Sequence, residues 1–369
     1  MSGARRSRAG LVVAAALIAL LCASLLLLRV QNGIESSFDL SVASAARAIG
    51  GWLGVAEPLA PTIQLVAEGR LVDGLAAVLV GAALALSGAL LQGLFRNELA
   101  SPGLIGVSSG ASLGAVVAIL IAGGEILEIQ ESDGAGALRA AAENAPLLIT
   151  SLAFGGALSV ALFVTALASR GGRISVPTLL LVGVAINACL GGALAAIQDV
   201  LLREKWEFAQ AMFAWLFGKL DERTPEQLWI AAAGLGAAIA AVPFVARELD
   251  LVAGGEDTAS SLGVAVGRTK LIALAAASIA AASAVAVAGQ IAFVGLVVPH
   301  VVRLALGARH GVLLPFAALG GAVFLLGAET INIGLLGPRH MSPGIVLSLV
   351  GGPFFLAMLL RRRREVSTW

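Results

Sequence analysis

The sequence predicts an all-α polytopic membrane protein, and composition is the first observation that predicts it. Of the 369 residues, 59% are hydrophobic and only 13% are charged, with a mean hydropathy of +0.95. Soluble domains are roughly 45–50% apolar and about 25% charged, so this chain has too little charge to cover a water-facing surface. Its 45 glycines are typical of closely packed transmembrane helices. The composition excludes a soluble enzyme, and the net charge of +1 excludes a nucleic-acid-binding protein.

The second observation is a series of apolar runs, because a helix needs about 20 such residues to cross a bilayer. The run 11–28 resembles a signal peptide, but its length of about 18 residues exceeds the usual 7–15, and we interpret it as a membrane anchor. Only Gly289 and Gln290 separate two later runs, so hydropathy alone allows nine or ten spans. The predicted spans are 11–28, 74–95, 103–123, 146–168, 176–198, 227–246, 270–289, 291–306, 312–332 and 343–360.

The third observation is the position of the arginines, which decides between nine and ten spans. Arg5, Arg6 and Arg8 lie near the start of the chain, and residues 361–364 are four consecutive arginines. Basic residues mark the cytoplasmic side of a membrane protein. Both termini are therefore expected in the cytoplasm, which requires an even number of spans. Ten transmembrane helices satisfy this condition.

The polar segments between the spans indicate one membrane domain over 1–369. The acidic segment 124–145 and the segment 29–72 are expected outside the cytoplasm, with 29–72 lying along the periplasmic membrane surface. The segment 247–270 is expected as a cytoplasmic loop. Acidic residues near its middle and Gly263 after them favour a short helix that docks into a partner's groove. A solvated loop without such a role is the alternative reading.

The absence of certain motifs restricts the chemistry of the chain. No phosphate-binding G-x-x-x-x-G-K-[ST] motif occurs, so we expect no ATP hydrolysis by the chain itself. The three histidines are scattered, and we expect neither a zinc protease nor any other metal site. Asp73 and Glu329 lie near span ends, whereas an ion-coupled carrier usually keeps ionisable groups at depth. The energy for any transport is therefore expected to come from elsewhere.

Two further patterns each have more than one interpretation. Polar residues meet helix breakers at 96–103 and at 298–303, and each is either a helix end or a re-entrant turn beside a pathway. Gly106, Gly110 and Gly114 form a stripe of small residues on the third predicted span. Such a stripe lets two helices approach closely, and packing within one chain is favoured over a dimer contact.

At this point three long motifs resemble a known family. VGAALALSGALLQGLFRNELASPGLIGVSSGASLG (80–114), GQIAFVGLVVPHVVRLALG (289–307) and GIVLSLVGGPFFLAMLLRRR (344–363) resemble the permease subunits of importers for iron siderophores, haem and cobalamin, the FecCD type of ATP-binding-cassette (ABC) transporter. The segment LDLVAGGEDTASSLGV (249–264) is similar to the part of the family that couples to the ATPase. The resemblance extends from about residue 70 to the C-terminus.

The resemblance implies a ten-span type II ABC importer permease that forms a homodimer in the lipid of the bacterial inner membrane. Two ATPase subunits would bind ATP below it, a periplasmic substrate-binding protein would dock above it, and the chain itself would bind no cofactor. The fifth and tenth spans would line the pathway. The implied coupling residues are Glu256, Ala259, Leu262 and Gly263, and the pathway candidates are Asn187, Gln92, Asn97 and Pro299.

The chain also departs from the family pattern. Glu98 stands where the family usually has a proline, and Asp73 stands where it usually has an arginine of the outer rim. Family arginines at this rim are thought to pair with acidic residues of the binding protein, and Arg70 and Arg339 are the remaining candidates here. A charge change at a rim mostly alters association rate and partner choice. We therefore expect a binding protein with altered docking charges.

These observations favour a permease that imports an iron siderophore or a related metal chelate, driven by ATP hydrolysis on a separate subunit. Haem or cobalamin is the alternative cargo for the same type of permease. A secondary transporter that works without an ATPase is the alternative mechanism, and the scarcity of carboxylates at depth speaks against it. An intramembrane enzyme would need a nucleophile and base, or paired carboxylates, within the spans, and the sequence offers neither.

Overall fold

The computed structural model describes residues 2–31, 42–52, 54–57, 59–131, 135–170, 173–337 and 340–366. Over these residues the fold is helical except for one hairpin of two-residue strands, β1 (Ser169–Arg170) and β2 (Arg173–Ile174), paired antiparallel. The helices are α1 (Ser2–Gln31), α2 (Val42–Trp52), α3 (Pro61–Phe95), the 3-10 helix η1 (Pro102–Ile105), α4 (Val107–Glu131), α5 (Ala135–Ala168), α6 (Val176–Glu204), α7 (Trp206–Leu216), α8 (Pro225–Ala253), α9 (Glu256–Ser261), α10 (Val266–Ala288), α11 (Val294–Leu306), α12 (His310–Leu336) and α13 (Pro343–Val366).

Ten of these helices coincide with the ten predicted spans. Six of them, α3, α5, α6, α8, α10 and α12, are long and apolar enough to cross a membrane. Shorter apolar stretches lie at the other four, within α1, α4, α11 and α13. The break at Gly289 separates α10 from α11, because Gly289 (φ +73°) and Phe293 (φ +66°) both leave the right-handed helical region. The prediction of two separate helices at this point is confirmed.

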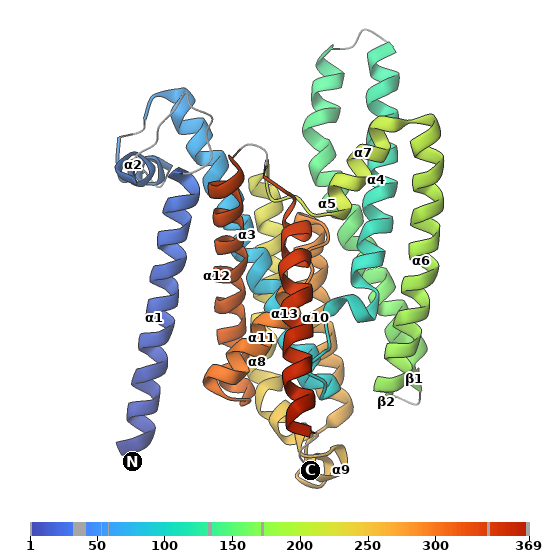
Figure 1. Ribbon diagram of the computed structural model, residues 1–369. Coiled ribbons are helices and arrows are strands. Elements are labelled where there is room, and N and C mark those ends of the chain that lie inside the picture. The colour runs from blue at the N-terminus through green and yellow to red at the C-terminus, as the bar shows by residue number, and fades with distance from the viewer. Residues whose placement is uncertain are drawn as a thin grey trace.

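Helices α3 and α10 form the buried centre of the bundle (Figure 1). Helix α1 packs along α12 and α3 on one side, while α4, α5, α6 and α7 pack together on the other. Small residues bring α3 against its neighbours: a Cβ atom at Gly81 would overlap the carbonyl of Gly321 on α12, and one at Gly88 would overlap the carbonyl of Gly295 on α11. The centre is therefore held by direct contact between backbones, as is typical of membrane helices.

The glycine stripe on α4 also packs within the chain, as predicted. Cβ atoms at Gly110 and Gly114 would overlap the backbone carbonyls of Gly156 and Leu152 on α5. Gly106 differs from the expectation, because it has φ +82° and ends η1 rather than lying on α4.

The two ends of the bundle carry different elements. Both ends of the chain lie at the end that carries α9 and the β hairpin, which we call the α9 end (Figure 1). Helices α2 and α7 lie at the opposite end, which we call the α7 end. The segments expected as loops are partly helical: α2 and the first turns of α3 occupy much of 29–72, and α4 and α5 extend into 124–145. Helices continue beyond their apolar cores because polar side chains at the ends of a span are compatible with the membrane interface.

The contact between α3 and α11 gives a first testable prediction. Gly88→Val should lower the thermal unfolding temperature of the detergent-solubilised chain by several degrees, because the obstruction is backbone and overpacking a core costs about 1–3 kcal/mol or more. Gly236→Val on α8 is the matched control, since no other atom lies within 4 Å of its Cβ position. Equal unfolding temperatures for the two variants would contradict the close packing of α3 against α11.

Candidate functional site at the α9 end

Helix α9 is built by glycines and acidic residues at defined positions. Gly255 has φ +124°, a conformation open to glycine, and it turns the chain from α8 into α9. Glu256 and Asp257 occupy the first turn, where the helix dipole favours negative charge, and Gly263 (φ +87°) follows the last turn. The short helix that the sequence predicts is confirmed. The connection spans only 254–265 instead of 247–270, because α8 runs on to Ala253 and α10 begins at Val266.

The four candidate coupling residues divide into two pairs. Leu262 is 65% exposed, and the Cβ position of Gly263 faces open space. Ala259 is fully buried, and Glu256 turns inward, with both carboxylate oxygens 2.7 Å from Nζ of Lys270. Leu262 and Gly263 therefore form the accessible tip of this segment, while Ala259 and Glu256 hold it against the bundle.

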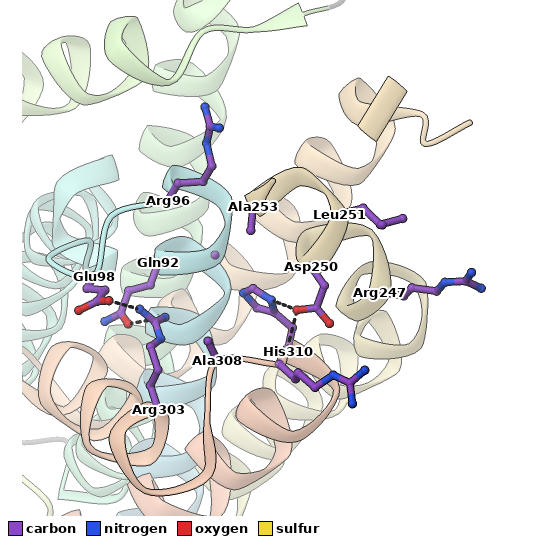
Figure 2. Close-up of a pocket in the computed structure, with 12 residues that line it drawn as sticks. Gln92, Arg96, Glu98, Arg247, Asp250, Leu251, Ala253, Arg303, Ala308 and His310 are labelled. Carbon is purple, nitrogen blue, oxygen red and sulfur yellow. Dashed lines mark hydrogen bonds and ion pairs between the residues drawn. The ribbon is translucent and has the colours of Figure 1, made fainter. Parts of the chain in front are cut away.

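A pocket of about 630 Å³ opens at the same end, between the ends of α3 and α8 and the connection from α11 to α12 (Figure 2). Its lining is rich in charge and is net basic. The charged residues are Arg96, Arg247, Arg303 and Arg309, with Glu98 and Asp250 as the acidic partners. The pocket also includes Gln92 and His310, and α9 follows directly from the last turn of α8.

Glu98, which replaces a proline of the family pattern, ties the turn after α3 to α11. Its carboxylate oxygens lie 3.2 Å from Nη1 of Arg303 and 3.2 Å from Nδ1 of His300. The Arg303 guanidinium also donates to Oε1 of Gln92 at 3.4 Å, as Figure 2 shows. The polar break at 96–103 and the break at 298–303 are therefore in contact, and each is stabilised by the other.

Asp250 and His310 join the end of α8 to the start of α12. Oδ1 of Asp250 accepts hydrogen bonds from the backbone N–H of His310 at 2.9 Å and lies 2.6 Å from Nδ1 of its ring (Figure 2). The ring is buried against Gly93 of α3, where any Cβ atom would overlap Nε2. Asp250 therefore provides an acceptor to the first N–H of α12, a group that has no partner within the helix.

The pathway candidates Gln92, Asn97 and Pro299 belong to this region. Gln92 is buried and donates to the carbonyl of Leu296 at 3.2 Å, and Pro299 is buried within α11. Asn97 is exposed, and its Oδ1 accepts a hydrogen bond from the N–H of Leu99 at 3.0 Å. The structure thus brings Gln92 and Pro299 into one interface and leaves Asn97 on the turn beside it. A role for the three in a pathway stays a prediction.

The fourth pathway candidate, Asn187, lies apart from this group on α6. Its side chain donates to the carbonyl of Gly103 at 2.8 Å and accepts from Oγ of Ser109 at 2.7 Å. Asn187 therefore connects α6 to η1 and α4. Its place in a pathway also stays a prediction, and the contact shows which elements would move together with α6.

Of the two docking candidates, the structure describes only Arg70. Arg70 is on α3 with only 9% of its surface exposed, and Arg339 lies outside the described residues. Asp73 is equally buried, and its Oδ1 accepts from the backbone N–H of Arg223 at 2.8 Å. Burial lowers the pKa of Arg223, and the attraction of Asp73, Asp221 and Glu222 opposes that shift. The Asp73 carboxylate thus makes a contact within the chain. Docking through Arg70 and Arg339 stays a prediction.

Sequence reasoning did not single out the partners at the α9 end. The links Glu256–Lys270, Glu98–Arg303 and Asp250–His310 each join residues that are at least 14 positions apart. Lys270 and Arg268 are the two cations in the first turns of an alanine-rich helix, and Lys270 lies at the start of its apolar stretch. That position is the signal that a buried partner exists, although it does not identify Glu256.

Comparison with known proteins places these features in a family. The model of the FecCD transport family matches residues 15–361. The chain is 39% identical to the cobalamin import system permease protein BtuC of Halobacterium salinarum, over 89% of this chain and 79% of that protein. It is also 39% identical to the hemin transport system permease protein HmuU of Yersinia pestis, over 81% and 84% of the two chains.

Two further matches extend the comparison. The ferric enterobactin transport system permease protein FepD of Escherichia coli is 33% identical, over 92% of this chain and 94% of that protein. A solved structure described as an inward-facing conformation of a metal-chelate type ABC transporter has the same fold, with a TM-score of 0.73, 24% identity and coverage of 93% of this chain and 97% of that one. The family match over most of the sequence and the identities with full-length permeases show that this chain belongs to the FecCD transport family.

Proposed function

We propose that this chain is the membrane-spanning permease subunit of an ABC importer for a metal chelate. The chelate comes from a periplasmic binding protein, and the energy comes from ATP hydrolysis on separate subunits. The observation that carries the proposal is α9 with its exposed Leu262, presented at one end of a bundle of the FecCD family. If ATP is hydrolysed on a separate subunit, that subunit must contact the permease, and α9 offers a surface for this contact.

The proposed topology has ten spans, with the α9 end on the cytoplasmic side of the membrane. Both chain ends lie at the same end of the bundle as α9, which supports an even number of crossings (Figure 1). Arginines near both ends, at positions 5–8 and 361–364, support the cytoplasmic side for that end. The α7 end then faces the binding protein, and the membrane is the bacterial inner membrane.

The proposed assembly contains two copies of this chain, two ATPase subunits and one binding protein. Apolar side chains on α6 and α13 support the homodimer: Leu181 is 73% exposed, and Leu349 and Val350 are more than 60% exposed. Helices α6 and α13 correspond to the fifth and tenth predicted spans, which the family resemblance expects to line the pathway. The pathway runs between the two copies, and lipid covers the remaining apolar surface.

The cargo is a siderophore, haem or cobalamin chelate, and the comparisons favour the last two. The cobalamin and hemin permeases are each 39% identical to this chain, whereas the ferric enterobactin permease is 33% identical. Haem and cobalamin are both large metal-bearing macrocycles derived from a tetrapyrrole. We therefore place a tetrapyrrole chelate ahead of a siderophore as the transported class.

Leu262 provides a test of the proposed ATPase contact. Leu262→Asp should weaken binding of the ATPase subunits about 10- to 100-fold, because burial of one leucine contributes about 1.5–3 kcal/mol. The measurement is the ATPase affinity of the purified chain in lipid nanodiscs. Val55→Asp is the matched control, since Val55 is an exposed apolar residue at the other end of the molecule. Unchanged affinity in Leu262→Asp would remove α9 as the contact.

The cargo is tested with the complete transporter and its binding protein in proteoliposomes. Hemin, cyanocobalamin and a ferric hydroxamate are offered separately, and ATP-dependent accumulation inside the vesicles is measured. We expect accumulation of one of the two tetrapyrroles and none of the hydroxamate. Accumulation of the hydroxamate alone would assign the chain to siderophore import.

A further inference from the structure

Lys270 is a buried cation at the α9 end that the proposed function does not yet use. It lies in the first turns of α10 with 5% of its surface exposed. Its Nζ is 2.7 Å from both carboxylate oxygens of Glu256 and 3.4 Å from the carbonyl oxygen of Ile174. A buried ammonium group is costly unless such partners surround it. The chain therefore keeps this charge in place through two specific contacts.

The two partners of Lys270 belong to elements with different roles. Glu256 is the first residue of α9. Ile174 is the last residue of β2, and the next residue, Ser175, is the N-cap of α6, whose side chain accepts from the N–H of Thr178. One ammonium group thus connects α9, α10 and the beginning of α6.

The space around this connection is partly open. A cavity of about 360 Å³ lies between the segments, and its lining includes Ile174, Glu256, Lys270, Asp257 and Ser260. The side chain of Lys270 hydrogen-bonds both Glu256 of α9 and the Ile174 carbonyl of β2, and it therefore offers a direct route by which a displacement of α9 reaches β2. The exposed pair of Lys219 and Glu222 at the other end of the molecule is different, since it joins neighbouring residues of one turn.

The beginning of α6 leads directly to the proposed pathway. Asn187, further along α6, is hydrogen-bonded to Gly103 and Ser109, so that η1 and α4 are attached to the same helix. The opposite side of α6 is exposed, with Leu181 as its most accessible large residue on this stretch. A movement at Ile174 would therefore be transmitted to the helix whose exposed side faces the proposed pathway between the two copies.

We propose that Lys270 is a positioning residue that couples α9 to α6. When an ATPase subunit displaces α9, Glu256 moves Lys270, and Lys270 moves the Ile174 carbonyl and the first turn of α6. This inference rests on the proposed function, because it requires an ATPase on α9 and a pathway along α6. In this proposal Glu256 contributes to coupling through its contact with Lys270, and Leu262 contributes through its contact with the ATPase.

The experiment uses the full complex of this chain, its ATPase subunits and its binding protein in proteoliposomes. Three quantities are measured for each variant: assembly of the complex, the rate of ATP hydrolysis, and the amount of chelate imported per ATP hydrolysed. Lys270→Met removes the charge and keeps the length of the side chain. Lys270→Arg keeps donors for both partners, and Lys219→Met is the matched control at the other end.

We expect Lys270→Met to assemble and to hydrolyse ATP, while chelate imported per ATP falls about 10-fold, in the range of allosteric couplings. Lys270→Arg should recover most of the loss, and Lys219→Met should behave as the natural chain. A purely structural role would lower assembly, hydrolysis and import together. That result, or an unchanged ratio of import to hydrolysis in Lys270→Met, would overturn the proposal.

A charge-swapped variant, Glu256→Lys with Lys270→Glu, covers the case in which Lys270→Met does not assemble. It restores an ion pair between α9 and α10 but places a carboxylate beside the Ile174 carbonyl. We expect the swapped complex to assemble and to stay uncoupled. Restored coupling would show that the Ile174 contact is not needed, and failure of both variants to assemble would assign Lys270 to folding alone; either result overturns the proposal.

The natural complex separates this inference from the proposed function. If it neither binds ATPase subunits nor imports a chelate with ATP, the proposed function fails whatever Lys270 does. If it imports with ATP and Lys270→Met imports as much per ATP, only the role of Lys270 fails.

Discussion

Direct backbone contact along α3 is the interaction on which the rest of this structure depends. Within a bilayer, burial of apolar side chains gives little advantage over lipid, so helices associate through close packing and hydrogen bonds. Gly81 and Gly88 let α12 and α11 approach the α3 backbone, and Oγ of Ser87 donates to the Ala277 carbonyl of α10 at 2.6 Å. Because α3 fixes its neighbours so closely, the irregular segments at the ends of the bundle are held at defined positions.

The few charged residues of the chain stabilise those irregular segments. Glu98 with Arg303 holds the turn after α3, Asp250 holds the start of α12, and Asp73 holds the turn before α8. Each of these contacts joins elements that are far apart in the sequence. The chain thus has few charged residues, and several of them are placed where they hold an irregular segment against the bundle.

Local sequence features predicted the positions of the long helices and of α9, and long-range contacts were the part that they could not supply. Apolar length and the position of Gly263 after the acidic residues are readable from neighbouring residues, which is why the helices at the predicted spans and the short helix agree with expectation. The burial of Arg70 and Asp73 depends on how α3 rotates against its neighbours, and the partner of Lys270 depends on the fold of 254–265. Hydropathy also underestimated the length of several helices, because it detects the apolar core of a helix and not the polar turns that extend it.

Dependence on ATP hydrolysis distinguishes the proposed importer from a carrier driven by an ion gradient. Proteoliposomes that contain the chain and its ATPase subunits, with proton and sodium gradients collapsed, are loaded with ATP on the ATPase side and offered a chelate bound to its binding protein. We expect accumulation of the chelate that stops when ATP is replaced by a non-hydrolysable analogue. Accumulation by the chain alone, driven by an ion gradient and without ATPase subunits, would contradict this expectation.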